Sequence, residues 1–378
     1  MYYKQGLRLG ILGGGQLGRM LIQAAVNLDL EIFVLDPDTD APCRYLAKEF
    51  QVGSLKNYDT VYHFGKQVDI LTIEIENVNV AALEQLEKEG IKVFPQPHVI
   101  KLVQDKGLQK DFYKQHHLPT APYYLLQHKD ELAQYLAFLP AVQKLRKEGY
   151  DGRGVHKIVS EKDYPNAFEQ PSVLEQMIAF EKELAVIVAR NANGDMAAFP
   201  AVEMDFHPEK NLVEYLFSPA NIKNDIESKA VNIAIQVAEN LGIIGLLAVE
   251  MFLTKDGEVL INEVAPRPHN SGHHTIEANM VSQYEQHLRA ILNMPLGDTA
   301  IKLPAVMVNL LGEPGFEGPV HYEGLETAMA IPGVNIHLYG KKKTKPFRKM
   351  GHITITDPDL EKAKEKAQIV KQTLKAIT

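Results

Sequence analysis

The chain has 378 residues, of which 45% are hydrophobic and 23% charged, with a formal net charge of −8 and a pI near 6.0. This length predicts two or three domains of ordinary globular composition, and the acidic balance argues against a nucleic-acid partner. Cys43 is the one cysteine, which excludes an intrachain disulfide and a thiolate metal cluster. No apolar stretch reaches ~18 residues and the N-terminus has no signal-peptide pattern, so we expect a cytoplasmic protein with no membrane partner.

The first hundred residues predict a parallel α/β domain, with strands expected at 7–12, 31–35, 68–73 and 92–94. The run Gly13–Gly18 (GGGQLG) lies between the first strand and a helix, and Asp36 ends the second strand. This is a G-x-G-x-x-G pattern, in which glycines let the backbone approach an anion and the helix N-terminus favours a phosphate. NAD is one candidate ligand and another phosphate compound is the alternative. Glu74 and Glu76 follow the third strand, at the edge of the sheet where ligands bind.

A second glycine-rich loop follows a predicted helix at about 99–116, which carries Lys106, and a predicted strand at 140–144, which ends in Lys144. The loop, LRKEGYDGRGV (145–155), is basic and flexible. Such a loop can be an ordinary surface hairpin, but it also fits a flap that closes over phosphates.

The most informative stretch is the hairpin predicted at 245–264. Two apolar runs flank Asp256-Gly257, a strong signal for a two-residue turn. With these two residues as the turn, Glu250 and Glu263 face each other at roughly 5 Å between Cβ atoms. Two facing carboxylates repel unless they are compensated. A divalent cation would compensate them, and all-oxygen ligation suits Mg²⁺. The alternatives are that one glutamate is protonated or that the register slips.

The loop after the hairpin is rich in hydrogen-bond donors, namely Arg267, His269, Asn270 and His273. Arg267 offers a planar fork for a carboxylate, bicarbonate or phosphate. Zinc is the weaker interpretation of the histidines, because no regular ligand spacing occurs. Beyond Leu296 the chain predicts a small, mostly β domain with a final helix, and its basic run at 341–349 is either a solvated face or a phosphate clamp.

Four motifs together resemble those of the N5-carboxyaminoimidazole ribonucleotide synthetase family, in the ATP-grasp superfamily: GGGQLGRM, GYDGRG, INEVAPRPHNSGHH and RKMGHI. The resemblance implies an α/β and α+β chain with a Rossmann-like domain (1–98), a two-lobed ATP-grasp domain (99–296) and a small C-terminal domain (297–378). It implies that ATP, bicarbonate and 5-aminoimidazole ribonucleotide give ADP, phosphate and the N5-carboxylated ribonucleotide, with Mg²⁺ and in a homodimer. One departure is Lys147-Glu148, where relatives commonly have a glycine before the Gly-Tyr-Asp-Gly run.

The same resemblance assigns roles to single positions. Glu250 and Glu263 match the metal ligands. Toward ATP it assigns two phosphate-binding lysines, the flap, an adenine-reading segment and their neighbours: Lys106, Lys144, Gly149, Tyr150, Asp151, Gly152, Arg153, Gly154, Val155, Glu175, Gln176, Met177, Ile178, Glu183, His207, Asn262 and Glu263. Strict alternation turns Asn262 away from the face of Glu263, so its side chain contributes only if the strand bends.

Toward the ribonucleotide the resemblance assigns the first glycine loop and two basic residues of the tail, with Glu76 or Glu74: Gly15, Gln16, Leu17, Glu76, Lys341 and Arg348. The carboxylation chemistry is assigned to Asp151, Arg153, Arg267, His269 and Asn270. Three alternatives stay open: a formate-dependent glycinamide ribonucleotide transformylase of the same superfamily, more remotely an NAD-dependent dehydrogenase, and a nucleotide-binding regulatory protein without turnover.

Overall fold

The computed structural model describes residues 1–147, 149, 154–206 and 212–378. The N-terminal part is a parallel sheet in the order β3-β2-β1-β4-β5, and its four predicted strands are confirmed. Its strands are β1 (Arg8–Leu12), β2 (Glu31–Asp36), β3 (Glu49–Val52), β4 (Ile70–Ile73) and β5 (Lys92–Val93). The helices that connect them are α1 (Gln16–Val26), α2 (Tyr58–Gly65) and α3 (Val80–Lys88). The carboxyl ends of β1, β2 and β4 therefore lie at one edge, which carries the glycine loop, Asp36 and Glu74.

The single helix predicted near 99–116 is two helices, α4 (Pro97–Val103) and α5 (Lys106–Gln115). The break has a local cause, because Asp105 caps α5 by accepting hydrogen bonds from the backbone N–H groups of Gly107 and Leu108. Arg146 also pairs with the Asp105 carboxylate at 2.8 Å. The break therefore fixes the start of α5, where Lys106 is the first residue.

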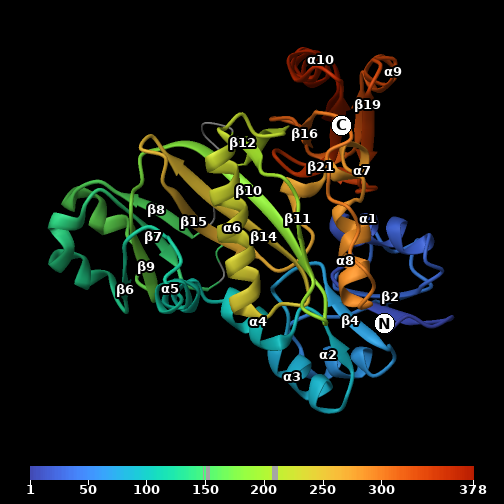
Figure 1. Ribbon diagram of the computed structural model, residues 1–378, viewed down its shortest axis with the longest axis horizontal. Helices are drawn as coiled ribbons and strands as arrows, with labels where there is room; N and C mark the ends of the chain where they lie inside the picture. The colour runs from blue at the N-terminus through green and yellow to red at the C-terminus, as the bar shows by residue number, and fades with distance from the viewer. Residues whose placement is uncertain (148, 150–153, 207–211) are drawn as a thin grey trace.

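Two antiparallel sheets follow the N-terminal part (Figure 1). The smaller one has the order β6-β9-β7-β8, formed by β6 (Tyr123–Leu126), β7 (Ala141–Leu145), β8 (Val155–Ile158) and β9 (Ser172–Gln176). In the described residues the larger one has nine strands, with the path β15-β14-β10-β12-β13-β16-β21-β19 and β11 beside β10. Its strands are β10 (Phe180–Arg190), β11 (Met196–Ala198), β12 (Val202–Phe206), β13 (Val213–Ser218), β14 (Gly245–Thr254), β15 (Val259–Ala265), β16 (Ala305–Leu311), β19 (Val334–Leu338) and β21 (Lys349–Thr356).

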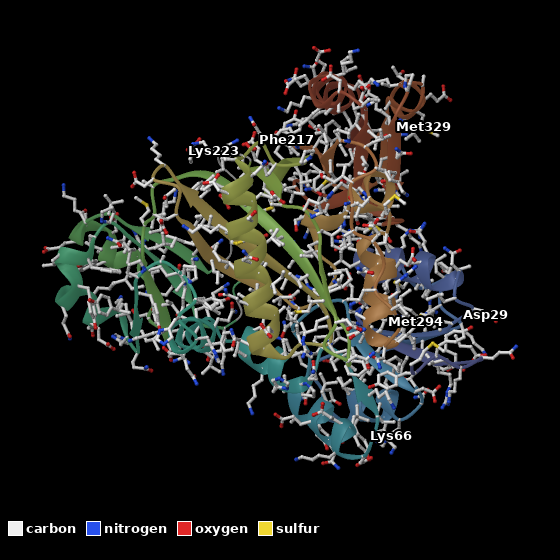
Figure 2. All side chains as sticks on the ribbon, in the orientation of Figure 1. Asp29, Lys66, Phe217, Lys223, Met294 and Met329 are labelled. Atoms are coloured by element: carbon white, nitrogen blue, oxygen red, sulfur yellow. The ribbon has the colours of Figure 1, made fainter. Side chains whose placement is uncertain are left out.

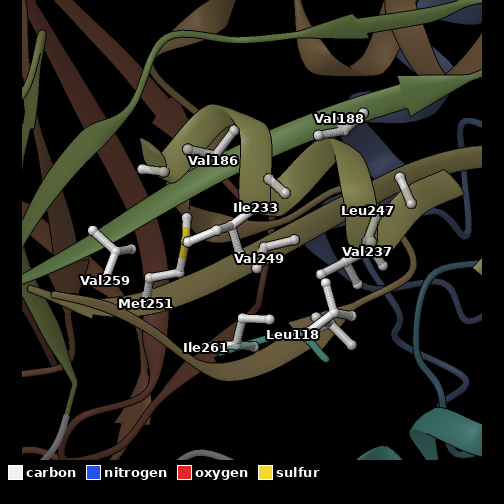
Figure 3. Close-up of a cluster of buried hydrophobic side chains, with 14 of the residues drawn as sticks. Leu118, Val186, Val188, Ile233, Val237, Leu247, Val249, Met251, Val259 and Ile261 are labelled. Atoms are coloured by element: carbon white, nitrogen blue, oxygen red, sulfur yellow. The ribbon is translucent and has the colours of Figure 1, made fainter. Parts of the chain in front are cut away.

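The main core lies between α6 (Asn224–Leu241) and the inner face of β10, β14 and β15 (Figure 3). The helix presents an apolar stripe that includes Ile233 and Val237, which meets Val186, Val249 and Met251 of the sheet. Gly242 ends α6 in the left-handed conformation with φ 60°, as expected for a glycine stop. This packing makes a rigid base for the β14–β15 hairpin, whose opposite face is free to carry polar side chains.

A second apolar cluster joins the N-terminal part to the large sheet, because α1 packs against α8 (Gln283–Ile291). Met294, labelled in Figure 2, packs against this cluster just beyond α8. A short helix, α7 (Thr275–Ala278), precedes α8. These contacts hold the glycine loop at a fixed place relative to the hairpin.

The C-terminal part shares the large sheet through the pairing of β13 with β16. Helix α10 (Leu360–Thr373) covers β16 and β21, and α9 (Leu325–Met329) lies beside it (Figure 1). Two short ladders complete it, β17 (Gly318–Pro319) with β20 (Lys343–Thr344) and β18 (His321–Glu323) with β22 (Lys375–Ile377). We propose to keep the division at residues 98 and 296, although the continuous sheet ties the second and third parts together. No described helix is both long and apolar enough to cross a membrane.

Candidate active site

A cavity of about 1990 Å³ lies where the three parts of the chain meet. Its lining brings together most of the residues that the sequence singled out, from positions as far apart as 15 and 348: Gly15, Gln16, Leu17, Glu74, Glu76, Lys106, Lys144, Gly149, Val155, Glu175, Gln176, Met177, Ile178, Glu183, Glu250, Asn262, Glu263, Arg267, His269, Asn270, Lys341 and Arg348. Gly154 is described but is outside the lining. Tyr150, Asp151, Gly152, Arg153 and His207 lie outside the described residues.

Glu250 and Glu263 are paired in the β14–β15 ladder, as the hairpin predicted, but by a different route. The turn has three residues, Lys255-Asp256-Gly257, with Gly257 at φ 80°, so the strand pairs next to it are shifted by one. A register shift at Asn262 then restores the predicted pairing. Such a bulge inserts one unpaired residue and bends the strand. The bend that Asn262 required is therefore present, and Asn262 and Glu263 both line the cavity.

The two glutamates have different electrostatic surroundings. Lys106 Nζ lies 2.6 Å from Glu263 Oε2, and this cation lowers the pKa of Glu263 to about 2. For Glu250, burial first, then the charges of Glu263 and Glu183, raise its pKa to about 8 against the opposing charges of Lys349 and Lys106. His269 Nε2 lies 3.5 Å from Glu250 Oε1, but burial lowers the pKa of His269 to about 3, so this ring is neutral. At neutral pH the pair therefore shares one negative charge, which resolves part of the expected repulsion.

The donor set fits a cation that takes oxygen ligands mainly from a bound substrate. Among the described residues, no group of three or more His, Cys, Asp and Glu side chains is arranged to hold a metal ion. Glu250 and Glu263 would thus supply only two protein ligands, which suits a hard cation that keeps water and phosphate ligands. In the described residues the histidines are likewise not grouped as zinc ligands.

Residues of the smaller sheet and of β10 also line the cavity. Lys144 of β7 donates to Asn262 Oδ1 at 2.9 Å and lies 3.2 Å from Glu175 of β9. Glu183 of β10 is largely desolvated, which raises its pKa to about 7. Next to these groups, Met177 is 39% exposed, so a polar cluster borders an apolar surface. An aromatic base and its phosphates need this combination.

The glycine loop differs from the expectation of an open phosphate site. The carboxylate of Glu74 accepts a hydrogen bond from the backbone N–H of Leu17 at 3.1 Å and so caps α1 itself. A Cβ added to Gly15 would come within 2.4 Å of Glu74 Oε1, which shows how closely the carboxylate approaches the loop. Asp36 is also engaged, because its Oδ2 accepts from the N–H of Gly14 at 2.6 Å. The acid that would bind a ribose in a dinucleotide site is thus turned onto the loop.

Glu74 and Glu76, between which the sequence left the choice open, have different hydrogen-bond and ion-pair partners. Glu74 is directed to the glycine loop, whereas Glu76 Oε1 lies 2.8 Å from Arg267 Nε. Arg267 also donates from Nη1 to the carbonyl of Pro268 at 3.0 Å. The guanidinium is therefore oriented by protein groups at the border between the first and second parts of the chain.

The remaining predicted residues are held by short polar contacts. Asn270 forms a reciprocal amide pair with Asn309, at 2.9 and 3.0 Å. On the C-terminal side, Lys341 Nζ donates to the carbonyl of Lys349 at 2.7 Å, and Arg348 Nη1 donates to that of Lys343 at 2.8 Å. Both basic residues line the cavity, so the basic run is more than a solvated face.

Two residues of this region were missed by sequence reasoning, whereas Lys349, which lines the cavity, lies in the basic run predicted at 341–349. Lys110 is buried and paired with Glu175, and its spacing of four from Lys106 predicts the same helix face. Asn309 is a single amide within the apolar strand β16, which is itself a sign of a polar partner.

Known proteins resemble this chain over its whole length. Residues 7–104 match the ribonucleotide synthetase preATP-grasp domain, residues 111–284 the ATP-grasp domain, and residues 305–366 the phosphoribosylaminoimidazole carboxylase C-terminal domain. The N5-carboxyaminoimidazole ribonucleotide synthase of Bacillus subtilis is 37% identical, over 92% of this chain and 91% of that protein. The chain belongs to the N5-carboxyaminoimidazole ribonucleotide synthase family.

Solved structures of this family agree with the assignment. The N5-carboxyaminoimidazole ribonucleotide synthetase of Thermotoga maritima is 43% identical with a TM-score of 0.91, covering 98% of this chain and 99% of that chain. The Aspergillus clavatus synthase in complex with ADP and 5-aminoimidazole ribonucleotide is 33% identical with a TM-score of 0.89, covering 98% and 99%. A longer relative is the chloroplastic phosphoribosylaminoimidazole carboxylase of Vigna aconitifolia, 39% identical over 93% of this chain. This chain spans 64% of the length of that protein.

Proposed function

We propose that the protein is an ATP-grasp carbon–nitrogen ligase that carboxylates 5-aminoimidazole ribonucleotide to N5-carboxyaminoimidazole ribonucleotide, in purine biosynthesis. The observation that carries the proposal is the shared cavity, whose lining combines Gln16 and Leu17, the Glu250–Glu263 pair, and Lys341 and Arg348. A nucleotide triphosphate and a second phosphorylated substrate both need cationic groups, and the cavity lining offers Lys106 and Lys144 from the second part of the chain and Lys341 and Arg348 from the third.

The chemistry begins with bicarbonate, which is a poor electrophile. A bicarbonate oxygen attacks the γ-phosphorus of ATP, ADP leaves, and carboxyphosphate forms. Lys106 and Lys144 neutralise the negative charge of the phosphates during this transfer. Mg²⁺ would be held by Glu250 and Glu263 and, when bound, would add charge neutralisation at the phosphoryl group.

The second step joins the carboxyl group to the amine. The amine of the ribonucleotide attacks the carboxyl carbon, the bond to phosphate breaks, and the nitrogen loses a proton to the departing phosphate. Arg267 and His269 would hold the carboxyl unit, with Arg267 oriented by Glu76 at 2.8 Å. The resemblance gives the role of excluding water from carboxyphosphate to the loop at 149–155, of which residues 150–153 lie outside the described residues. The neutral state of His269 at physiological pH suits a hydrogen-bonding role rather than a charged one.

Three further assignments belong to this proposal. Mg²⁺ is the resident cation, the enzyme is a homodimer, and it works in the cytoplasm. The single cysteine, Cys43, is buried and free, and so is compatible with a reducing compartment. Sedimentation velocity tests the dimer, and dependence of turnover on Mg²⁺ after chelation tests the cation.

The decisive experiment measures ATP-dependent phosphate release with defined substrate pairs. Bicarbonate with 5-aminoimidazole ribonucleotide should give rapid release, while formate with glycinamide ribonucleotide should give none above background. The reverse result would make the protein a formate-dependent transformylase. Hydride transfer to NAD with no phosphate release in either mixture would reject the ligase function altogether.

A further inference from the structure

A closed ring of polar contacts connects the two lobes of the ATP-grasp domain at the wall of the cavity. Lys110 Nζ lies 3.1 Å from Glu175 Oε2 and donates to Thr120 Oγ1 at 2.6 Å. Thr120 in turn donates to the carbonyl of Ile261 at 2.8 Å. Ile261 directly precedes the bulge residue Asn262, whose amide accepts from Lys144, and Lys144 returns to Glu175 at 3.2 Å. The ring therefore contains members of α5, β7, β9 and β15.

The two lysines of this ring have unequal access to a ligand. The side chain of Lys144 is 14% exposed and lines the cavity, whereas that of Lys110 is 3% exposed and is outside the lining. A bound phosphate can thus attract Lys144 but cannot reach Lys110. If Lys144 turns toward a phosphate, the buried carboxylate of Glu175 keeps Lys110 as its counter-charge.

We propose that Lys110 and Thr120 are positioning residues of the nucleotide site: Lys110 keeps Glu175 ionised and in place while Lys144 turns to the phosphates, and Thr120 fixes Lys110 to the strand that carries Asn262 and Glu263. The inference rests on the proposed function, since it assumes that the cavity takes a nucleotide triphosphate. It adds a structural link between Glu175, on the adenine side of the site, and the strand that carries Glu263, on the metal side.

The charges around Glu175 support this division of labour. The titratable groups that act on it are Lys106, Lys110 and Tyr113 from α5 and Lys144 from β7, and Tyr123 of β6 is its neighbour in the ladder. The hydroxyl of Tyr123 donates to Asp111, so this side chain is engaged away from the Glu175 carboxylate. Lysines 110 and 144 lower the pKa of Glu175 against its burial. A buried carboxylate that loses both would bind a proton instead.

The test measures proton uptake when the non-hydrolysable analogue β,γ-imido-ATP binds with Mg²⁺. Calorimetry in buffers of different ionisation enthalpy reports this uptake for the wild type and for Lys110→Met. Near pH 7, analogue binding to the variant should be accompanied by the uptake of more protons than in the wild type, by at most about one proton per site. The affinity of the variant for the analogue should also improve as the pH is lowered toward 6. A folded Lys110→Met protein with the proton uptake and pH profile of the wild type would overturn the inference.

A second pair of variants leaves every charge in place. Thr120→Val removes only the hydroxyl and should weaken analogue binding roughly tenfold, the effect of one hydrogen bond to a charged group, with the KM for the ribonucleotide unchanged. Thr120→Ser keeps the hydroxyl and should bind the analogue like the wild type. Equal affinity of the Val and Ser variants would contradict the proposal even if Lys110→Met fails to fold. If the wild type itself does not bind the analogue, the proposed function fails instead.

Discussion

Glu250 and Glu263 face each other in one ladder, yet we expect the substitution of glutamate by glutamine to have opposite effects on stability at the two positions. Glu250→Gln should stabilise the metal-free protein as the pH rises, because the neutral amide resembles the protonated acid that the folded state prefers. Glu263→Gln should destabilise it, because Lys106 would lose a partner at 2.6 Å. The two carboxylates are therefore not equivalent, in line with the alternative from the sequence that one glutamate is protonated.

The magnitudes follow from the pKa shifts. Glu250 has a folded pKa of about 8 against a reference of 4.5. Between these values the unfolded state has lost its proton and the folded state has kept it, so the free energy of unfolding falls by about 1.4 kcal/mol per pH unit. From pH 6 to pH 8 the wild type should lose at most about 2.7 kcal/mol through this group, and Glu250→Gln should lose none of it.

Glu263 behaves in the other direction. Its pKa is lowered to about 2, so its contribution is complete above the reference value of 4.5 and is lost only as the pH falls toward 2. Its side chain is 47% exposed, and solvent screening reduces the value of its pair with Lys106 to about 1 kcal/mol. Glu263→Gln should show this loss throughout the range from pH 6 to pH 8.

The assay is thermal unfolding of the chelator-treated protein between pH 6 and pH 8. The matched control is Glu258→Gln, an exposed glutamate of the same hairpin that pairs with Lys229. The gap in Tm between Glu250→Gln and the wild type should widen with pH, whereas the control should follow the wild type. Parallel curves for Glu250→Gln and the wild type would refute the assignment of the raised pKa to Glu250.

Three other predictions concern ligands. Arg267→Lys keeps the charge but loses the planar guanidinium that Glu76 contacts, so it should bind Mg-ATP normally while ribonucleotide carboxylation falls roughly 10- to 100-fold. A raised ratio of released phosphate to carboxylated product would support this prediction. A loss of ATP affinity with an unchanged ratio would contradict it. 5-Aminoimidazole ribonucleotide should raise the Tm and NADH should not; a shift from NADH alone would reverse the assignment of the glycine loop. Gly15→Ala places a Cβ within 2.4 Å of Glu74 Oε1, so it should raise the KM for the ribonucleotide but leave that for ATP unchanged; equal increases in both would point to general unfolding of the loop.

Local sequence patterns were sufficient for several features of this protein. The parallel N-terminal sheet followed from apolar runs of strand length, and the β14–β15 hairpin from an Asp-Gly pair between such runs. The facing of Glu250 and Glu263 was predicted with a two-residue turn, whereas a three-residue turn and a bulge at Asn262 produce it. The two differences cancel, because each changes the register by one residue.

The break between α4 and α5 has a local signal in the sequence, a helix-capping aspartate, that apolar periodicity does not detect. Asp105 directly precedes Lys106, and an aspartate at this position caps a new helix. The apolar pattern continues across this cap without interruption, and one long helix was therefore predicted.

Only the tertiary structure decided which groups compensate one another. Lys106 and Glu263 are 157 positions apart in the chain, and Lys144 and Asn262 are 118 apart. No local period relates such pairs, because they meet only after two sheets and α5 have packed together. The same holds for Glu74, which caps α1 where a phosphate was expected, since its approach to Leu17 depends on the parallel neighbours β1 and β4. The residue types of the site were therefore determined by the sequence, while their charge states depend on partners that long-range packing brings within hydrogen-bond distance.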